Sequence, residues 1–225
     1  MSFSFPIWLF LLGAIAVGVI AYLVFLMEKR RRVAFQAMAD HTGLRYAPDP
    51  NPELASHFEF LNALGNGSNH YARHVITGEV DGLEVVAFEY HYETYSSSEN
   101  GRKTHHHYLS VFTTNLSKSF PELTIRPEGV FSKIAQAVGY DDIDFESAEF
   151  SRRYCVRSRD KKFAYDVCHP LTMEFLMRFH DLDIEIEGTT LAAIQRGHLQ
   201  PNHVESNLRR LLAFRRLLPK YLLQS

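Results

Sequence analysis

Cysteine is scarce in this chain: its 225 residues include only Cys155 and Cys168. Their spacing fits neither a CxxC redox pair nor a zinc knuckle. One disulfide would suit an extracellular domain of this size, whereas two thiols are ordinary in a reducing compartment. The spacing favours two unlinked thiols and argues against a disulfide-rich scaffold.

The sequence lacks the short motifs of the common enzyme classes. It has no G-x-S-x-G elbow, no Walker loop and no H-E-x-x-H segment. Cys168 and His169 are neighbours in sequence, which does not make them a nucleophile and its base in space. We therefore predict no catalytic residue, no cofactor-binding residue and no cofactor.

Excess charge of one sign is also missing, since the formal net charge is −2. This gives no electrostatic reason to expect a nucleic-acid partner. Apolar residues make up 46% of the chain and charged residues 22%, which is ordinary for a folded domain.

Asp, Glu, Lys, Arg and His are absent from the apolar segment between Ile7 and Met27. A helix of this length spans about 30 Å, the thickness of a bilayer's hydrocarbon core. Residues 1–6 carry no Lys or Arg, and no A-x-A-like cleavage sequence follows the segment directly. We predict a retained transmembrane helix over residues 7–27, preceded by a short tail at 1–6.

Basic residues follow this helix directly, in the sequence Glu28-Lys29-Arg30-Arg31-Arg32. The positive-inside rule then predicts the N-terminus outside and the rest of the chain in the cytoplasm. These cations suffice as topology determinants, and they are also candidates for contact with lipid headgroups. The candidate headgroup contacts are Lys29, Arg30, Arg31, Arg32, Arg209, Arg210 and Arg216.

The helical pattern continues past the membrane segment to His41 or Thr42, and Gly43 is placed as its C-terminal cap. Residues 28–43 thus form a juxtamembrane basic helix, and 44–225 a soluble domain. Its clearest element is a β-hairpin, Tyr71–Val80 and Leu83–Tyr92, because Asp81-Gly82 suits a type I′ turn.

Further elements follow from alternation, helical periodicity and turn residues. We expect a short helix at Glu53–Leu61, strands at Thr104–Thr114, Leu123–Arg126, Tyr154–Arg157, Phe163–Val167, Ile184–Glu187 and Thr190–Gln195, and helices opening at Pro127-Glu128, Pro170 and Asn202. Short connections favour antiparallel pairing. The predicted fold is α+β: a transmembrane helix, then a mainly antiparallel sheet with about three packed helices.

Histidine is abundant, with 12 residues including His105-His106-His107. On a strand, His105 and His107 point to one face and His106 to the other, so the triplet cannot form one site. Two of these histidines could still join His91 or His74 across the sheet. No carboxylate or cysteine at a familiar spacing completes a ligand set, so we predict no metal residue.

An acidic segment, Asp141 to Glu149, offers carboxylates for a cation, but it lacks the glycine of an EF-hand loop. We expect a surface linker in which Ile143, Phe145 and Phe150 reach the core.

The C-terminal helix opens with a capping-box pattern, Asn202 to Glu205, and carries a broad apolar stripe interrupted by Arg215. Such a basic amphipathic helix can pack on the sheet or lie on an anionic membrane.

The layout of the whole chain resembles an uncharacterised family of bacterial single-pass inner-membrane proteins with a cytoplasmic α+β domain. The resemblance rests on the anchor with its cations, on Val75-Ile76-Thr77-Gly78, and on Asp142-Ile143-Asp144-Phe145-Glu146 leading to Glu149-Phe150-Ser151-Arg152. It implies an inner-membrane location and brings no activity or functional residue.

The predicted function is a membrane-tethered cytoplasmic interaction or scaffold domain that contacts the lipid bilayer and a protein partner. The alternative is an ion-dependent sensor or enzyme that uses the acidic segment 141–149 and the sheet histidines.

Overall fold

The computed structural model describes residues 7–98, 101–128, 142–179 and 181–223. Helix α1, Ile7–Thr42, runs without a break from the apolar segment into the juxtamembrane segment. Its apolar window has a mean hydropathy of 2.6 and is not covered by the rest of the chain. Within the described residues this is the one helix long and apolar enough to span a bilayer. Gly43, with φ of 71°, follows its last turn as expected.

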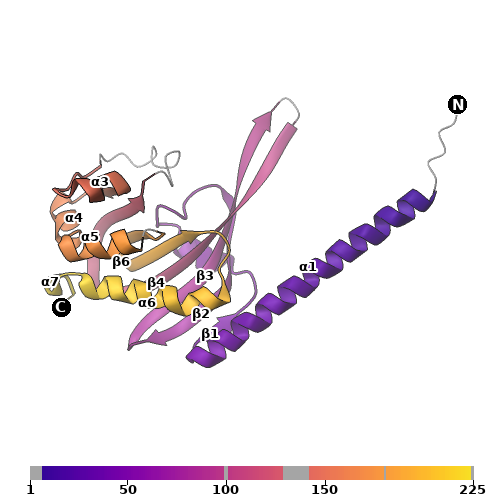
Figure 1. The fold of residues 1–225 in the computed structure, drawn as a ribbon, viewed down its shortest axis with the longest axis horizontal. Coiled ribbons are helices and arrows are strands. Elements are labelled where there is room, and N and C mark those ends of the chain that lie inside the picture. The colour runs from indigo at the N-terminus through magenta and orange to yellow at the C-terminus, as the bar shows by residue number, and fades with distance from the viewer. Residues whose placement is uncertain (1–6, 99–100, 129–141, 180, 224–225) are drawn as a thin grey trace.

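A six-stranded antiparallel sheet forms the body of the domain (Figure 1). The strands are β1 Arg45–Ala47, β2 Ser68–Val80, β3 Leu83–Ser98, β4 Gly101–Pro127, β5 Tyr154–Ser158 and β6 Asp183–Arg196. They pair in the order β1-β2-β3-β4-β5, and β6 pairs with β4 as well. The predicted β2–β3 hairpin is confirmed, with Val80 opposite Leu83.

Helices cover both faces of this sheet. They are α2 Pro52–His57, α3 Ala148–Arg153, α4 Lys161–Val167, α5 Pro170–Arg178, α6 Pro201–Leu217 and α7 Lys220–Leu223. On one face, Phe88 and Tyr90 pack against Phe58 and Leu61, which follow α2. The larger core on the other face includes residues of α3 to α7 and Phe35 of α1. The α+β class is therefore correct, with more helices than the three we expected.

Two pairs of expected strands are in fact single long strands. The segments at 104–114 and 123–126 both belong to β4, and those at 184–187 and 190–195 both belong to β6. The pairing register of β4 with β6 shifts on both sides of Phe120, which pairs with Gly188. The alternation of apolar and polar residues is interrupted within both segments, which suggested that strands end there. In the structure β4 and β6 continue through these irregularities.

The expected strand Phe163–Val167 is wrong, because these residues belong to helix α4. The Asp160 side chain accepts a hydrogen bond from the Phe163 amide (3.1 Å) and so caps the helix. Phe163, Ala164 and Val167 are buried, a spacing that places them on one helical face. A short apolar run suits either element, and the capping aspartate decides for the helix.

Three helix boundaries also differ from expectation. Helix α6 begins at Pro201 after Gln200, without a side-chain cap, so the predicted capping box is wrong. Helix α2 ends at His57 rather than at Leu61. Pro127 is the last residue of β4 and Glu128 lies in a turn, so no helix opens there; the predicted helix from residue 129 onward lies outside the described residues.

Candidate functional site

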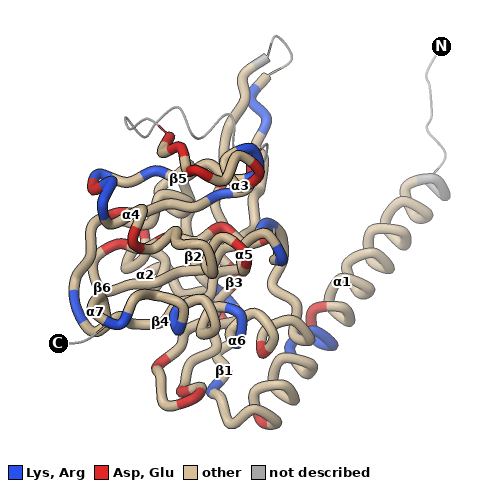
Figure 2. Tube along the Cα trace, turned by 60° about the vertical axis from the view of Figure 1, so that its left-hand side comes forward, with Lys and Arg blue, Asp and Glu red and all other residues tan. Residues whose placement is uncertain are grey.

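The second half of α1 is built into the domain. Phe35 and Ala39 have no exposed surface, and Phe35 stacks on Tyr46 of β1 and His74 of β2. Figure 2 shows acidic and basic residues gathered where α1 reaches the domain. The membrane segment and the sheet are thus joined through packing as well as through the chain.

Glu89 of β3 lies at the centre of this junction and has no exposed surface. Its carboxylate accepts hydrogen bonds from Arg31 of α1, from Nε of Arg73 (2.5 Å), from Nδ1 of His198 (3.1 Å) and from the Leu199 amide (2.9 Å). We call Glu89 and these four residues the Glu89 cluster. It ties together α1, β2, β3 and the loop between β6 and α6.

Two arginines keep the buried carboxylate ionised. Burial alone would raise the pKa of Glu89, but the hydrogen bonds and charges of Arg31 and Arg73 lower it to about 2. Arg31 also donates to the Leu199 carbonyl (2.7 Å), which lies 168 residues further along the chain. Charge and backbone groups therefore hold α1 in one position on the sheet.

His74 of β2 also contacts Arg31 at this junction. Arg31 can only donate, so Nε2 of His74 accepts from it (3.1 Å) and Nδ1 donates to the Tyr46 hydroxyl (2.7 Å). Burial and the charge of Arg31 lower the pKa of His74 to about 4. This histidine is neutral at physiological pH and acts as part of the packing.

A groove of about 560 Å³ opens where α1 leaves the domain; it is lined by Val24, Met27, Glu28, Arg30, Arg31, Arg73, His198 and Gln200. We call it the α1 groove. Its apolar end, Val24 and Met27, belongs to the predicted membrane segment. Its polar end carries Arg30 together with cations of the Glu89 cluster.

The basic residues predicted to meet lipid have different surroundings. Arg31 faces inward to the Glu89 cluster, and Arg30 lines the α1 groove. Arg32 pairs with Glu28 (3.3 Å) and Asp49 (3.2 Å). On α6 the pairs are Arg209–Glu205 (2.8 Å), Arg210–Asp181 (3.4 Å) and Arg216–Asp81 (2.6 Å).

Helix α6 packs on the domain rather than standing free. Val204, Leu208, Leu211, Leu212 and Phe214 are buried. Arg215, which interrupts the apolar stripe, donates to the Asn115 carbonyl of β4 (3.2 Å). Of the two arrangements that the sequence allowed, docking on the sheet is the one observed.

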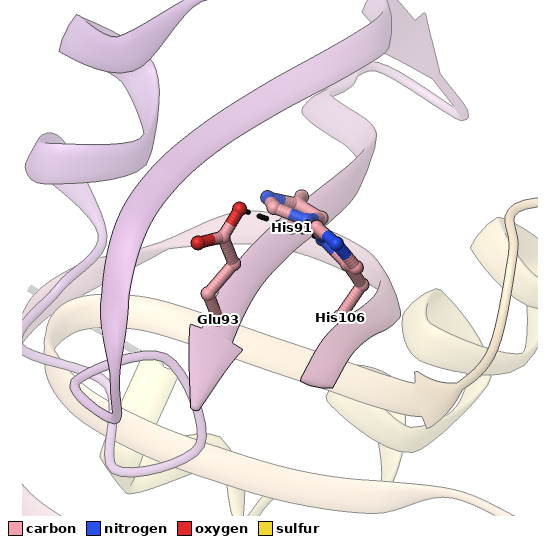
Figure 3. Close-up of side chains that lie close together, drawn as sticks. All are labelled: His91, Glu93 and His106. Atoms are coloured by element: carbon pink, nitrogen blue, oxygen red, sulfur yellow. Dashed lines mark hydrogen bonds and ion pairs between the residues drawn. The ribbon is translucent and has the colours of Figure 1, made fainter. Parts of the chain in front are cut away.

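The histidine triplet alternates between the faces of the sheet, as expected for a strand. His105 contacts Ser96 and His107 contacts Thr94 on one face (2.9 and 2.8 Å). On the other face His106 approaches His91 and Glu93 of β3 (Figure 3). The histidine that contacts His91 across the two strands is thus His106 (3.1 Å), whereas His74 contacts Arg31 of α1.

Within the acidic segment, Ile143, Phe145 and Phe150 are buried, as predicted for a linker anchored to the core. The Asp142 carboxylate bonds to Arg157 Nε (2.7 Å) and to the Cys155 thiol (2.8 Å). Glu149 pairs with Arg153 (3.0 Å). These carboxylates thus make surface ion pairs, and Asp141 lies outside the described residues.

Both cysteines are unlinked, and both are unsuited to nucleophilic attack. Burial and the Asp142 carboxylate raise the pKa of Cys155 to about 12. Burial raises the pKa of Cys168 to about 12 as well. The reactive thiolate form is therefore scarce at neutral pH.

Comparison with known proteins gives a fold and no family. No family model matches the chain, and no curated protein sequence matches it. The crystal structure of the mycobacterial trehalose monomycolate transport factor A, TtfA, is similar in fold. The TM-score is 0.57 at 14% sequence identity, and the match covers 85% of this chain and 96% of TtfA. At this identity, the likeness to TtfA shows the α+β fold alone.

A second buried ion pair lies away from α1 and was not predicted. Arg126 of β4 donates to Glu185 of β6 (2.5 Å), whose carboxylate also accepts from the Ala63 amide (3.1 Å). Burial raises the pKa of Asp183, two residues away on β6, to about 7. A repeated acid on an apolar strand, Asp183 then Glu185, is the sequence signal that could have indicated these buried charges.

Proposed function

We propose that this chain is a single-pass protein of a bacterial inner membrane, with its N-terminus outside and its domain in the cytoplasm. The domain acts as a scaffold that holds a protein partner at a fixed place beside the inner leaflet. The carrying observation is that α1 passes from the apolar segment into the core without a break and is fixed there by the Glu89 cluster.

A fixed connection suits a scaffold better than a freely acting enzyme. A flexible linker would let the domain rotate and move away from the bilayer. Here, Phe35 and Ala39 are packed in the domain, within four helical turns of Met27 on the same unbroken helix. The domain therefore has one height and one orientation relative to the membrane helix, as positioning a partner requires.

The structural neighbour fits a role of this kind. TtfA is described as a transport factor, and assisting transport at a membrane is one role that a scaffold of the proposed kind can have. The fold likeness supports this form without identifying what would be transported.

The scaffold proposal is tested by separating the anchor from the domain. A flexible Gly-Ser segment inserted between Met27 and Glu28 keeps both parts and removes the fixed connection. We expect the partners captured by cross-linking in intact cells to be lost from this variant. Cross-linked products are identified by mass spectrometry of the purified full-length chain.

The same Gly-Ser segment inserted before Ile7 is the matched control, because it leaves the connection intact. Its cross-linked partners should equal those of the wild type. If the Met27–Glu28 insertion kept the same partners, or if the purified protein turned over substrates in a broad hydrolase and nucleotide panel, the scaffold proposal would be wrong.

The α1 groove is where we propose that the chain contacts an anionic phospholipid. A headgroup phosphate would lie beside Arg30, and an acyl chain beside Val24 and Met27. Lys29 has the same charge one position earlier on α1, but it does not line the groove. Comparing variants of Arg30 and Lys29 therefore distinguishes a specific lipid site from a general attraction of basic residues to the membrane.

Arg30→Gln is expected to weaken retention of phosphatidylglycerol by the detergent-purified chain several-fold, whereas Lys29→Gln leaves it near the wild-type level. An exposed cation near a lipid surface contributes about 1 kcal/mol. Native mass spectrometry of the two variants measures the retained lipid. Equal losses in both variants would mean that the contact is unspecific.

A further inference from the structure

Three side chains of the β3–β4 hairpin converge on one face of the sheet: His91, Glu93 and His106. Pairing of Glu93 with His106 brings them together, because His91 lies two residues before Glu93 on the same face. Their nearest ligand atoms all lie within 4.8 Å of one another. Figure 3 shows both imidazole rings and the carboxylate turned toward a common point.

Two of the three distances between these atoms are close to the edges of a metal tetrahedron. Zn²⁺ binds imidazole nitrogen and carboxylate oxygen at about 2.0–2.2 Å, which places tetrahedral ligand atoms about 3.3–3.6 Å apart. His91 Nε2 and His106 Nδ1 are 3.1 Å apart. His106 Nδ1 and Glu93 Oε1 are 3.4 Å apart. The third distance, between His91 and Glu93, is at most 4.8 Å, so the Glu93 carboxylate would move toward His91 when an ion binds.

Hydrogen bonds from other residues orient two of the three ligands, His91 and Glu93. The Asn69 carbonyl can only accept, so Nδ1 of His91 carries its hydrogen and donates to it (3.2 Å). The lone pair of neutral His91 is therefore on Nε2, on the side of His106. The Asn69 side-chain amide (2.8 Å) and the Tyr95 hydroxyl (3.0 Å) both donate to Glu93. Such outer partners commonly fix the tautomer and direction of metal ligands.

The third ligand, His106, can also turn a lone pair toward the ion. Nδ1 of His106 faces Nε2 of His91. The hydrogen between these two nitrogens must leave before both of them can bind a metal ion. Because His106 is exposed, its ring can bind through Nδ1 and carry its proton on Nε2, facing water.

We propose that His91 Nε2, Glu93 Oε1 and His106 Nδ1 bind a divalent transition-metal ion of the zinc class, with a fourth position open to solvent. The mixed nitrogen and oxygen set suits Zn²⁺, Co²⁺ or Ni²⁺ rather than Mg²⁺ or Ca²⁺. The site is independent of the Glu89 cluster and of the scaffold proposal.

The histidine triplet provides the test and its control. Untagged full-length protein in mild detergent is titrated with Zn²⁺ by calorimetry and with Co²⁺ by visible absorption. The wild type is expected to bind one equivalent, and His106→Gln to weaken binding at least tenfold. His105→Gln leaves binding unchanged, because His105 is equally an exposed neighbour but lies on the opposite face.

A thermal-shift measurement with Zn²⁺ checks that the variants are folded and shows whether the ion stabilises them.

Glu93→Gln should weaken binding as well, since it removes the anionic ligand. Absence of stoichiometric binding by the wild type would overturn the proposal. So would equal weakening by His105→Gln and His106→Gln, which would indicate adsorption to surface histidines.

Discussion

Replacing Glu89 by leucine is expected to lower the free energy of unfolding by on the order of 3 kcal/mol, because it leaves two arginines without their buried partner. Arg31 and Arg73 lose their carboxylate, and the Leu199 amide loses its acceptor. The arginine side chains are 18% and 23% exposed, so water recovers part of the loss. Thermal unfolding in mild detergent should show a Tm lower by about 6–12 °C.

The same variant should loosen α1 from the domain. Hydrogen exchange of the amides in residues 28–42 is expected to become faster, while exchange in the membrane segment stays slow. Glu84→Leu on the same strand is the control, because Glu84 is exposed, and its Tm should stay within about 1–2 °C of the wild type. Unchanged exchange of residues 28–42 in Glu89→Leu would contradict the role of the Glu89 cluster.

Acid should act on this junction only at very low pH. The pKa of Glu89 is lowered from 4.5 to about 2 in the folded chain. Its contribution to stability is therefore fully present above the unfolded value and is lost as the pH falls through about 2. At physiological pH the α1 junction does not respond to protonation of Glu89.

Arg126→Met is expected to cost about 3–5 kcal/mol, because Glu185 has 2% of its surface exposed and would be left as an unpaired buried acid. Asp183 beside it would lose the favourable charge of Arg126 as well. Equilibrium unfolding in urea measures the loss as a lower midpoint with an unchanged slope.

The double variant Arg126→Met/Glu185→Met tests whether the loss of stability comes from an unpaired buried charge, because it removes both charges. Replacing both partners by apolar side chains of similar length is often neutral or stabilising. We expect the double variant to recover most of the stability that the single variant loses. A double variant as unstable as Arg126→Met would show that the loss comes from packing and not from an unpaired charge.

Local chemistry made part of the fold predictable from the sequence. The apolar run from Ile7 to Met27 and Gly43 after it are read from neighbouring residues alone, and so is the Asp81-Gly82 turn. The alternation along β3 can be read in the same way, since Glu89 and His91 share a face with Val85 and Ala87. This alternation marks a polar patch on one face of the sheet.

The partners of that patch could not be predicted, because they depend on long-range register. Arg31 and Leu199 reach Glu89 from opposite ends of the chain. His106 rather than His105 meets His91 because of the register in which β3 pairs with β4. Alternation along a strand predicts that His106 lies on the face opposite His105, but the alignment of that face with Glu93 depends on the pairing register.

The contact between Arg31 and Leu199 has a consequence for biogenesis. Their separation of 168 residues corresponds to about 8–34 s of synthesis at about 5–20 residues/s. The first helix is therefore made, and available for insertion into the bilayer, long before its acceptors on the loop after β6 exist. If this helix enters the bilayer during synthesis, Phe35 and Arg31 spend that interval beside the lipid surface without their partners, and the domain completes its core there.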